Sequence, residues 1–302
     1  MTTRSTARET DPPLTRFTRT AETVAGSVIS AYSTSFGLAT RLLGTRHRTH
    51  VKNIYALVRV ADEIVDGVAS EAGLSIAEQF AALDRYTEET HRALRTGYSS
   101  DLVIHAFART AREAGIGESL TQPFFDSMRA DLEEAHEEVA VYDVGAHAAY
   151  VYGSAEVVGL MCLRVFLRGQ GVREDERARL EHGARQLGAA FQNVNFLRDL
   201  ADDTARLGRS YLGVEGRLTD ADRDRWVTEV RRQLADAEAT LPLLPRDARA
   251  AIRTALGLFA ELTARVAATP AEELYRTRVR VPDAIKIGLA LRALLTTMKE
   301  GR

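Results

Sequence analysis

The chain has 302 residues, of which 45% are hydrophobic and 27% charged, and its formal net charge is -2 at pH 7. This composition excludes a disordered or polybasic chain, and no nucleic-acid partner is expected. One large domain is expected because no Ser/Gly-rich linker or change of composition separates two halves. The oligomeric state stays open.

The N-terminal segment "MTTRSTARETDPPLTR" is rich in Thr and Arg and has no apolar core. We therefore expect a disordered tail at residues 1–18 and a single domain at 19–302. No uninterrupted apolar run of about 18 residues is present, so no transmembrane helix is predicted. The expected location is cytoplasmic. A further hypothesis is peripheral contact of the protein with the inner face of the membrane.

Proline placement and apolar spacing together predict an all-α fold. The seven prolines leave long uninterrupted segments between them, and within these segments apolar residues recur every three or four positions. Thr219 and Pro282 are predicted helix starts, and Gly67, Gly115, Gly169 and Gly208 are predicted stops. The expected helices lie near 20–43, 50–67, 75–95, 101–114, 119–138, 144–168, 173–206, 219–240, 246–268 and 282–299.

The first predicted helix contains "AYSTSFGLATRLL", in which Ser33 and Ser35 precede an apolar segment. Hydroxyls and backbone N–H groups near a helix start or break can hold phosphate oxygens. Helix capping is the commoner role of such serines, and both interpretations stay open.

The second predicted helix contains "VRVADEIVDG", which places acids inside an apolar pattern. Asp62 and Asp66 are four residues apart, so on a helix they share one face about 6 Å apart along the axis. Arg59 and Tyr55 lie one and two turns earlier on nearly the same face.

The middle helices contain a charged run and a small-residue run. The run "DLEEAHEE", from Asp131 to Glu138, is interpreted as a solvated face, as are Glu63 and Glu156. In "AYVYGSAEVVGLMCLRVF", small residues stand among apolar ones, which fits either a tunnel wall or close helix packing. The single cysteine, Cys162, is interpreted as a core thiol.

The long predicted helix 173–206 contains "FQNVNFLRDLADD". Gln192, Asn195, Asp199 and Asp203 follow one another at three- and four-residue steps, with Arg198 beside them. Two polar stripes therefore cross two otherwise apolar helices.

An uncompensated buried carboxylate costs several kcal/mol, so cations must face these acids unless they form a solvated face. Arg59 and Arg198 are too few for the acids present. Oxygen-only ligand sets favour magnesium over zinc, and magnesium keeps oxygens from water and substrate phosphate. We therefore prefer a metal-bridged phosphorylated substrate to a solvated face paired with arginines.

The last predicted helix carries Lys286, Arg292 and Lys299 among apolar residues. It is interpreted as an ordinary packing helix in preference to a membrane-docking one.

These segments resemble the squalene/phytoene synthase family. "YALVRVADEIVD" is similar to its first aspartate-rich motif and "LGAAFQNVNFLRDLADDTARLGRSYL" to its second. The segments "YSTSF", "YVYGSAEVVGLM" and "RVRVP" match further family blocks in the same order, and the phytoene synthase branch is the most similar. Phe259 stands where some members have a tyrosine.

The resemblance implies an isoprenoid synthase fold, a single helical bundle around a central cavity, and magnesium or manganese as the metal. It implies metal ligation by Asp62, Asp66, Asn195, Asp199 and Asp203. It implies substrate contacts from Ser33, Ser35, Tyr55, Arg59, Gln192, Arg198 and Arg278, with Tyr150 near the reacting carbons. The implied catalytic residues are Asp62, Asp66, Asp199, Asp203 and Tyr150.

The implied reaction joins two prenyl diphosphates head to head. Two geranylgeranyl diphosphates would give phytoene through a cyclopropylcarbinyl diphosphate, with release of diphosphate. The alternative is farnesyl diphosphate giving squalene, dehydrosqualene or presqualene diphosphate, with NADPH needed only for squalene. A different hypothesis is a non-catalytic helical protein that binds prenyl diphosphate.

Overall fold

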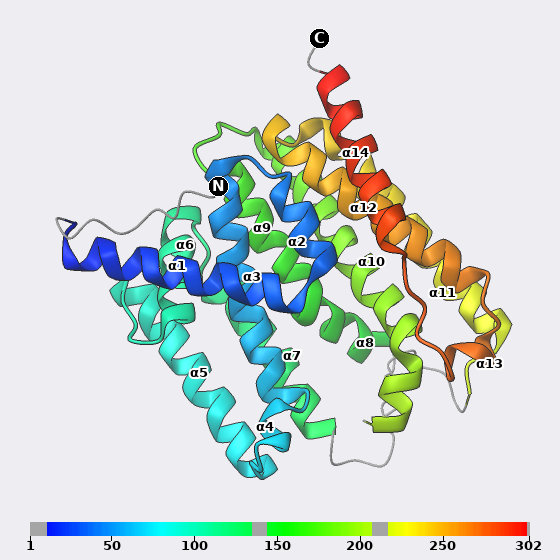
Figure 1. The fold of residues 1–302 in the computed structure, drawn as a ribbon, viewed down its shortest axis with the longest axis horizontal. Coiled ribbons are helices and arrows are strands. Elements are labelled where there is room, and N and C mark those ends of the chain that lie inside the picture. Colours follow the sequence, from blue (N-terminus) through cyan, green and yellow to red (C-terminus); the bar gives the residue numbers. More distant parts are fainter. Residues whose placement is uncertain (1–10, 135–143, 207–216, 301–302) are drawn as a thin grey trace.

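The computed structural model describes residues 11–134, 144–206 and 217–300, and all regular structure in these ranges is helical. This confirms the all-α prediction (Figure 1). The α-helices are α1 Pro13–Tyr32, α2 Thr34–Arg41, α3 Thr45–Val65, α4 Val68–Glu71, α5 Ile76–Thr96, α6 Leu102–Ala114, α7 Glu118–Glu134, α8 Val144–Val151, α9 Val157–Leu167, α10 Glu174–Arg206, α11 Asp220–Glu238, α12 Arg246–Ala267, α13 Ala271–Leu274 and α14 Asp283–Lys299.

The first predicted helix is two helices, because the chain breaks at Ser33. Ser33 has extended backbone angles (φ -143°, ψ 111°), and its side chain accepts a hydrogen bond from the Phe36 N–H. This serine therefore caps α2, as Ser and Thr do at helix starts. Helix α1 begins at Pro13, where proline has no N–H to leave unpaired. It thus includes residues that were assigned to the N-terminal tail.

Several predicted helix ends are confirmed by local geometry. Thr219 and Asp222 form a reciprocal capping box at the start of α11, and Pro282 precedes α14. Gly115 ends α6 with φ 70°, a conformation that glycine adopts without strain. Gly208 lies outside the described residues.

The small residues of the segment after α8 are used for close helix packing. A π-helical turn, Tyr152–Glu156, joins α8 to α9. A Cβ on Gly153 would lie 2.3 Å from the Pro123 carbonyl oxygen of α7, and one on Gly159 would lie 2.5 Å from the Ala184 carbonyl oxygen of α10. The geometry at these two glycines favours close packing over a tunnel wall.

Helices α3 and α10 lie in the middle of the bundle, with α1, α5 and α6 on one side and α11, α12 and α14 on the other (Figure 1). Leu57 and Ala61 of α3 and Val194 and Leu197 of α10 are fully buried. Burial of these apolar faces leaves the polar stripes of both helices at fixed positions.

One segment, Gly145–Leu167, is long and apolar enough to cross a membrane by length and composition. Half of its most apolar window is buried inside the bundle, which is typical of a core helix. Cys162 lies in this segment and packs against the core, and burial raises the pKa of its thiol to about 12. This agrees with its interpretation as a core thiol.

Candidate functional site

The first acidic pair lies at the C-terminal end of α3. Asp62 is partly buried on the last turn, and Asp66 caps the helix, its N–H donating to the Asp62 carbonyl oxygen at 2.7 Å. Burial raises the pKa of Asp62 well above its ordinary value, and the Asp66 and Asp131 carboxylates raise this pKa further, while Arg59 lowers it. The surroundings of the Asp62 carboxylate therefore carry too little positive charge to balance its negative charge.

The arginine of this helix is only partly available to Asp62. Arg59 forms an ion pair with Glu63 one turn later, and its guanidinium lies 4.5 Å from the centre of the Tyr32 ring. Its Nε is buried without a hydrogen-bond partner among the described residues. Glu63 is thus paired and its side chain is only 16% exposed, so its assignment to a solvated face was wrong.

Tyr55 and Ser33 bring α3 and the start of α2 together. A hydrogen bond links their side chains. The pKa of the Tyr55 phenol is raised, because the effect of burial outweighs Arg59 and this hydrogen bond, which lower it. Both residues are partly buried. The described structure thus brings together three of the residues predicted to contact substrate, namely Ser33, Tyr55 and Arg59.

Asp131 of α7 is a candidate site residue that the sequence interpretation missed. It is 3% exposed, and the Tyr150 hydroxyl of α8 donates to its two carboxylate oxygens at 2.9 and 3.0 Å. Its assignment to a solvated face was therefore wrong. The signal was the spacing, because Asp131 follows the buried residues Phe124 and Met128 at helical steps.

The second acidic stripe lies on α10. Asp199 forms an ion pair with the neighbouring Arg198, whose Nε lies 2.8 Å from Oδ1. The Nε of Arg278, from the segment before α14, also lies 2.8 Å from Asp199 Oδ1. The Oδ1 of Asn195, one turn earlier, is buried and has no hydrogen-bond partner in the described part of the chain. Arg278 was predicted as a substrate contact, and it reaches this stripe.

The two stripes are connected through α7, α8 and α2. The Tyr150 ring lies 6.0 Å from that of Phe196 on α10, while Asp131 acts electrostatically on Asp62. At the other end, the Phe36 ring lies 6.3 Å from Tyr55 and 5.9 Å from Phe191 on α10. These contacts place both polar stripes around one region of the bundle.

An aromatic cluster adjoins this region. Phe191 and Phe259 stack with ring centroids 3.6 Å apart, and Phe36 lies 6.0 Å from Phe259. Phe259 stacks directly through its ring face, a contact that requires no phenolic hydroxyl. The cluster gives the region an apolar wall beside its charged groups.

Some predicted site residues are placed only in part. Gln192 is partly buried on α10, one turn from Asn195. Ser35 and Asp203 lie on α2 and α10, but their side chains lie outside the described residues, as does that of Asp202. Glu156 pairs with Arg185 at 2.6 Å and is 13% exposed, so its assignment to a solvated face was wrong.

Oxygen donors suited to magnesium occur on both stripes, on Asp62, Asp66, Asn195 and Asp199. Three or more His, Cys, Asp or Glu side chains do not gather into a metal-binding group in residues 11–134, 144–206 and 217–300. The unpartnered Asn195 oxygen and the excess negative charge at Asp62 nevertheless fit a hard cation. A cavity of about 310 Å³ elsewhere, lined by residues of α1 and α6, lies away from these acids.

Comparisons with known proteins bear on the family of the chain. The squalene/phytoene synthase family model matches residues 29–284. A 15-cis-phytoene synthase from Paracoccus is 29% identical, with 86% of each chain covered. A phytoene synthase from Pseudescherichia vulneris is 31% identical, with 78% of this chain and 79% of the relative covered.

Plant relatives are longer. Phytoene synthase 3 from Zea mays is 31% identical over 78% of this chain, and the chain spans about half (54%) of its length.

Solved structures show the same fold. A dehydrosqualene synthase superposes with a TM-score of 0.76 at 20% identity, covering 95% of this chain and 100% of that one. A squalene synthase from Alicyclobacillus acidocaldarius superposes with a TM-score of 0.68 at 16% identity, covering 87% and 97%. The predicted isoprenoid synthase fold is thereby confirmed. The family match and the phytoene synthase relatives carry the assignment further than the fold does: the chain belongs to the squalene/phytoene synthase family, whose members are prenyltransferases.

Proposed function

We propose that the protein condenses two prenyl diphosphates head to head, with two geranylgeranyl diphosphates giving phytoene. The observation that carries this proposal is an acidic stripe on α3 with too little positive charge around Asp62, beside a second acidic stripe on α10 that two arginines reach. The phytoene synthase relatives support the geranylgeranyl substrate. Farnesyl diphosphate, giving squalene or dehydrosqualene, is the alternative that the structural neighbours favour.

The positively charged side chains of the site would bind the diphosphate groups. Arg198 and Arg278 converge on Asp199 from different parts of the chain, so a diphosphate beside Asp199 would meet two guanidinium groups. Arg59, with Tyr55 and Ser33, offers donors near the other stripe. Guanidinium groups stabilise the negative charge that develops on departing diphosphate, which lowers the barrier to ionisation.

Asp62, Asp66, Asn195, Asp199 and Asp203 would hold magnesium, or manganese in its place. When bound, the metal acts as a Lewis acid that neutralises the charge of the leaving diphosphate. Through that metal, the acids of the chain would fix the positions of the diphosphate groups.

The apolar wall would protect the allylic cation formed when diphosphate leaves. The stacked rings of Phe191 and Phe259 present apolar surface that excludes water. Tyr150, held by Asp131, offers an oriented hydroxyl near the α10 side of the site. Attack by the double bond of the second substrate gives the cyclopropylcarbinyl diphosphate, and a second ionisation with rearrangement and proton loss gives phytoene.

A test is incubation of the purified protein with magnesium and either geranylgeranyl or farnesyl diphosphate, with and without NADPH. The expected product is phytoene from geranylgeranyl diphosphate without NADPH. A product of thirty carbons from farnesyl diphosphate would establish the alternative substrate. Tight binding of either substrate with no turnover would instead establish the non-catalytic hypothesis.

A cytoplasmic location, with contact to the membrane that stores the apolar product, accompanies this proposal. Fractionation of cells that produce the protein tests it, and recovery outside the cell would contradict it.

A further inference from the structure

Helix α14 has apolar side chains on two opposite faces. One face packs on the bundle through residues that include Ala290 and Ala293, which are 6% and 2% exposed. The other face is exposed: of the ten large apolar side chains that are exposed in the described part of the chain, five lie on this helix. We name these five the α14 stripe: Ile287, Leu291, Leu294, Leu295 and Met298.

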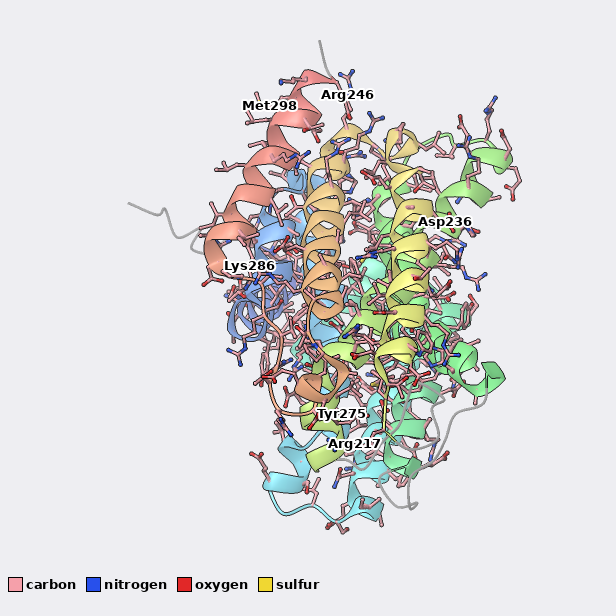
Figure 2. All side chains as sticks on the ribbon, turned by 90° about the vertical axis from the view of Figure 1, so that its right-hand side faces the viewer. Arg217, Asp236, Arg246, Tyr275, Lys286 and Met298 are labelled. Atoms are coloured by element: carbon pink, nitrogen blue, oxygen red, sulfur yellow. The ribbon has the colours of Figure 1, made fainter. Side chains whose placement is uncertain are left out.

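The α14 stripe is one continuous surface. Its members follow at steps of four, three, one and three residues, which places them on one side of a helix over about 16 Å of its length. They are 38% to 63% exposed, and Met298 at the end is the most exposed. Figure 2 shows α14 on the outside of the bundle, with Lys286 near its first turn and Met298 near its last. A contiguous apolar surface of this kind marks a docking site.

The charges beside the α14 stripe are positive. Both acids of this segment are neutralised within the chain, because Asp283 pairs with Lys286 at 3.0 Å and Glu300 pairs with Arg253 at 2.5 Å. Arg292 and Lys299 flank the stripe on one side and are exposed. Neither has an ion-pair partner within residues 217–300 or the other described ranges. The free charge of this surface is therefore cationic.

We infer that the α14 stripe docks on an anionic lipid bilayer, with Arg292 and Lys299 at the headgroups and the five apolar side chains below them. Lysine and arginine beside an apolar helix face place their charges at headgroup level while the apolar side chains enter the acyl boundary. A second copy of the chain fits less well. In such a dimer the Arg292 and Lys299 side chains of both copies would lie at one interface, and among residues 283–300 no acid is free to pair with them.

The α14 stripe is connected to the candidate site at its start. The Lys286 ammonium donates to the Thr34 hydroxyl of α2 at 3.3 Å, next to Ser33. Docking through α14 would therefore hold the α2 side of the site near the bilayer, where prenyl chains dissolve. The docking itself rests on the surface of α14 and not on the proposed function, so each can fail without the other.

Sedimentation with vesicles tests the inference, without substrate or metal. The full chain is mixed with vesicles of phosphatidylcholine alone or of phosphatidylcholine with phosphatidylglycerol, and we expect binding to the anionic vesicles. Arg292→Gln and Lys299→Gln are each expected to weaken that binding by about fivefold. The double variant Leu291→Gln/Leu295→Gln is expected to weaken it by at least about tenfold.

The matched control is Leu14→Gln/Val68→Gln, which removes two side chains that are 61% and 52% exposed elsewhere on the surface. It should bind like the parent, and unchanged melting curves by circular dichroism would show that all variants fold. Failure of the parent protein to bind anionic vesicles would overturn the inference, as would full binding by Leu291→Gln/Leu295→Gln. Light scattering could also overturn the inference. If the parent protein is a dimer and Leu291→Gln/Leu295→Gln is a monomer, the α14 stripe joins two copies of the chain.

Discussion

The same fold places two aspartates, Asp247 and Asp62, in environments that shift their pKa values in opposite directions. Asp247, in the first turn of α12, accepts from Arg46 at 2.6 and 3.0 Å and contacts His47 at 3.1 Å. These contacts, the Arg46 hydrogen bond first, lower its pKa to about 2. Burial, and then the neighbouring acids Asp66 and Asp131, raise the pKa of Asp62. The difference separates a structural carboxylate, completed within the chain, from one for which we propose a metal ligand.

The sharpest test of this contrast is Asp62→Asn. We expect turnover to fall by roughly 10²–10³-fold, the loss associated with one preorganised stabilising group, and Asp199→Asn should behave alike. The free energy of unfolding of Asp62→Asn should not fall, because this substitution removes a charge that burial disfavours. Steady-state kinetics and thermal melting check both parts. Near-normal turnover, or a clear loss of stability, would contradict the proposed role of Asp62.

Ligand addition should stabilise the protein through the same residues. Magnesium diphosphate, added as one complex at about a hundred times its dissociation constant, should raise the free energy of unfolding by about 2.7 kcal/mol. The increase should be largely lost in Asp62→Asn. Melting temperature against ligand concentration measures it, with Asp84→Asn, a surface variant whose side chain is 50% exposed, as the control. An equal increase in Asp62→Asn and the parent would place binding elsewhere.

Asp131 extends the comparison to a buried acid that has a partner. Asp131→Asn weakens the charge-assisted bond from Tyr150, so we expect about a tenfold loss of turnover, the equivalent of about 1.4 kcal/mol. Tyr150→Phe should cost a similar factor, and the double variant no more than either single one if the pair acts as a unit. Multiplying losses would show that Asp131 and Tyr150 act separately.

The smallest effect is expected at Asp247. Because this side chain is 37% exposed, solvent screens its ion pair, and Asp247→Asn should lower the free energy of unfolding by about 1 kcal/mol with turnover unchanged. Its folded pKa of about 2 lies below the unfolded value, so the stabilisation is present above about pH 4 and is lost as pH falls toward 2. Denaturant unfolding of both proteins across this range should show the gap closing. A gap that is constant with pH would indicate a non-electrostatic cause.

Most of the fold was predictable because proline and glycine mark helix ends by local chemistry. Thr219 starts α11 through a capping box with Asp222, three residues later, and Gly115 ends α6 because it has no side chain. The break at Ser33 was missed because the apolar pattern continues across it. Capping was one of the two roles left open for this serine, and the hydrogen bond from the Phe36 N–H confirms it. The π-helical turn depends on the packing of Gly153 against α7, which no local pattern encodes.

The site was predictable where residues share one helix and less so where they meet across helices. Asp62 with Asp66, and Asn195 with Asp199, follow from spacing alone. The proximity of Arg278 to Asp199 joins parts far apart in sequence, and only the resemblance to a family indicated it. Asp131 was hidden within a run of charged residues, although its position relative to Met128 is that of a buried residue.

The central claim is that the acids of α3 and α10 are completed by metal and diphosphate. The most direct measurement is a crystal structure with manganese and a non-ionisable prenyl thiodiphosphate analogue, using anomalous scattering to locate the metal. We predict manganese bound to Asp62 or Asp66 and to Asn195 or Asp199, with diphosphate oxygens beside Arg278. Manganese-free carboxylates, with the analogue bound elsewhere or not at all, would contradict the claim.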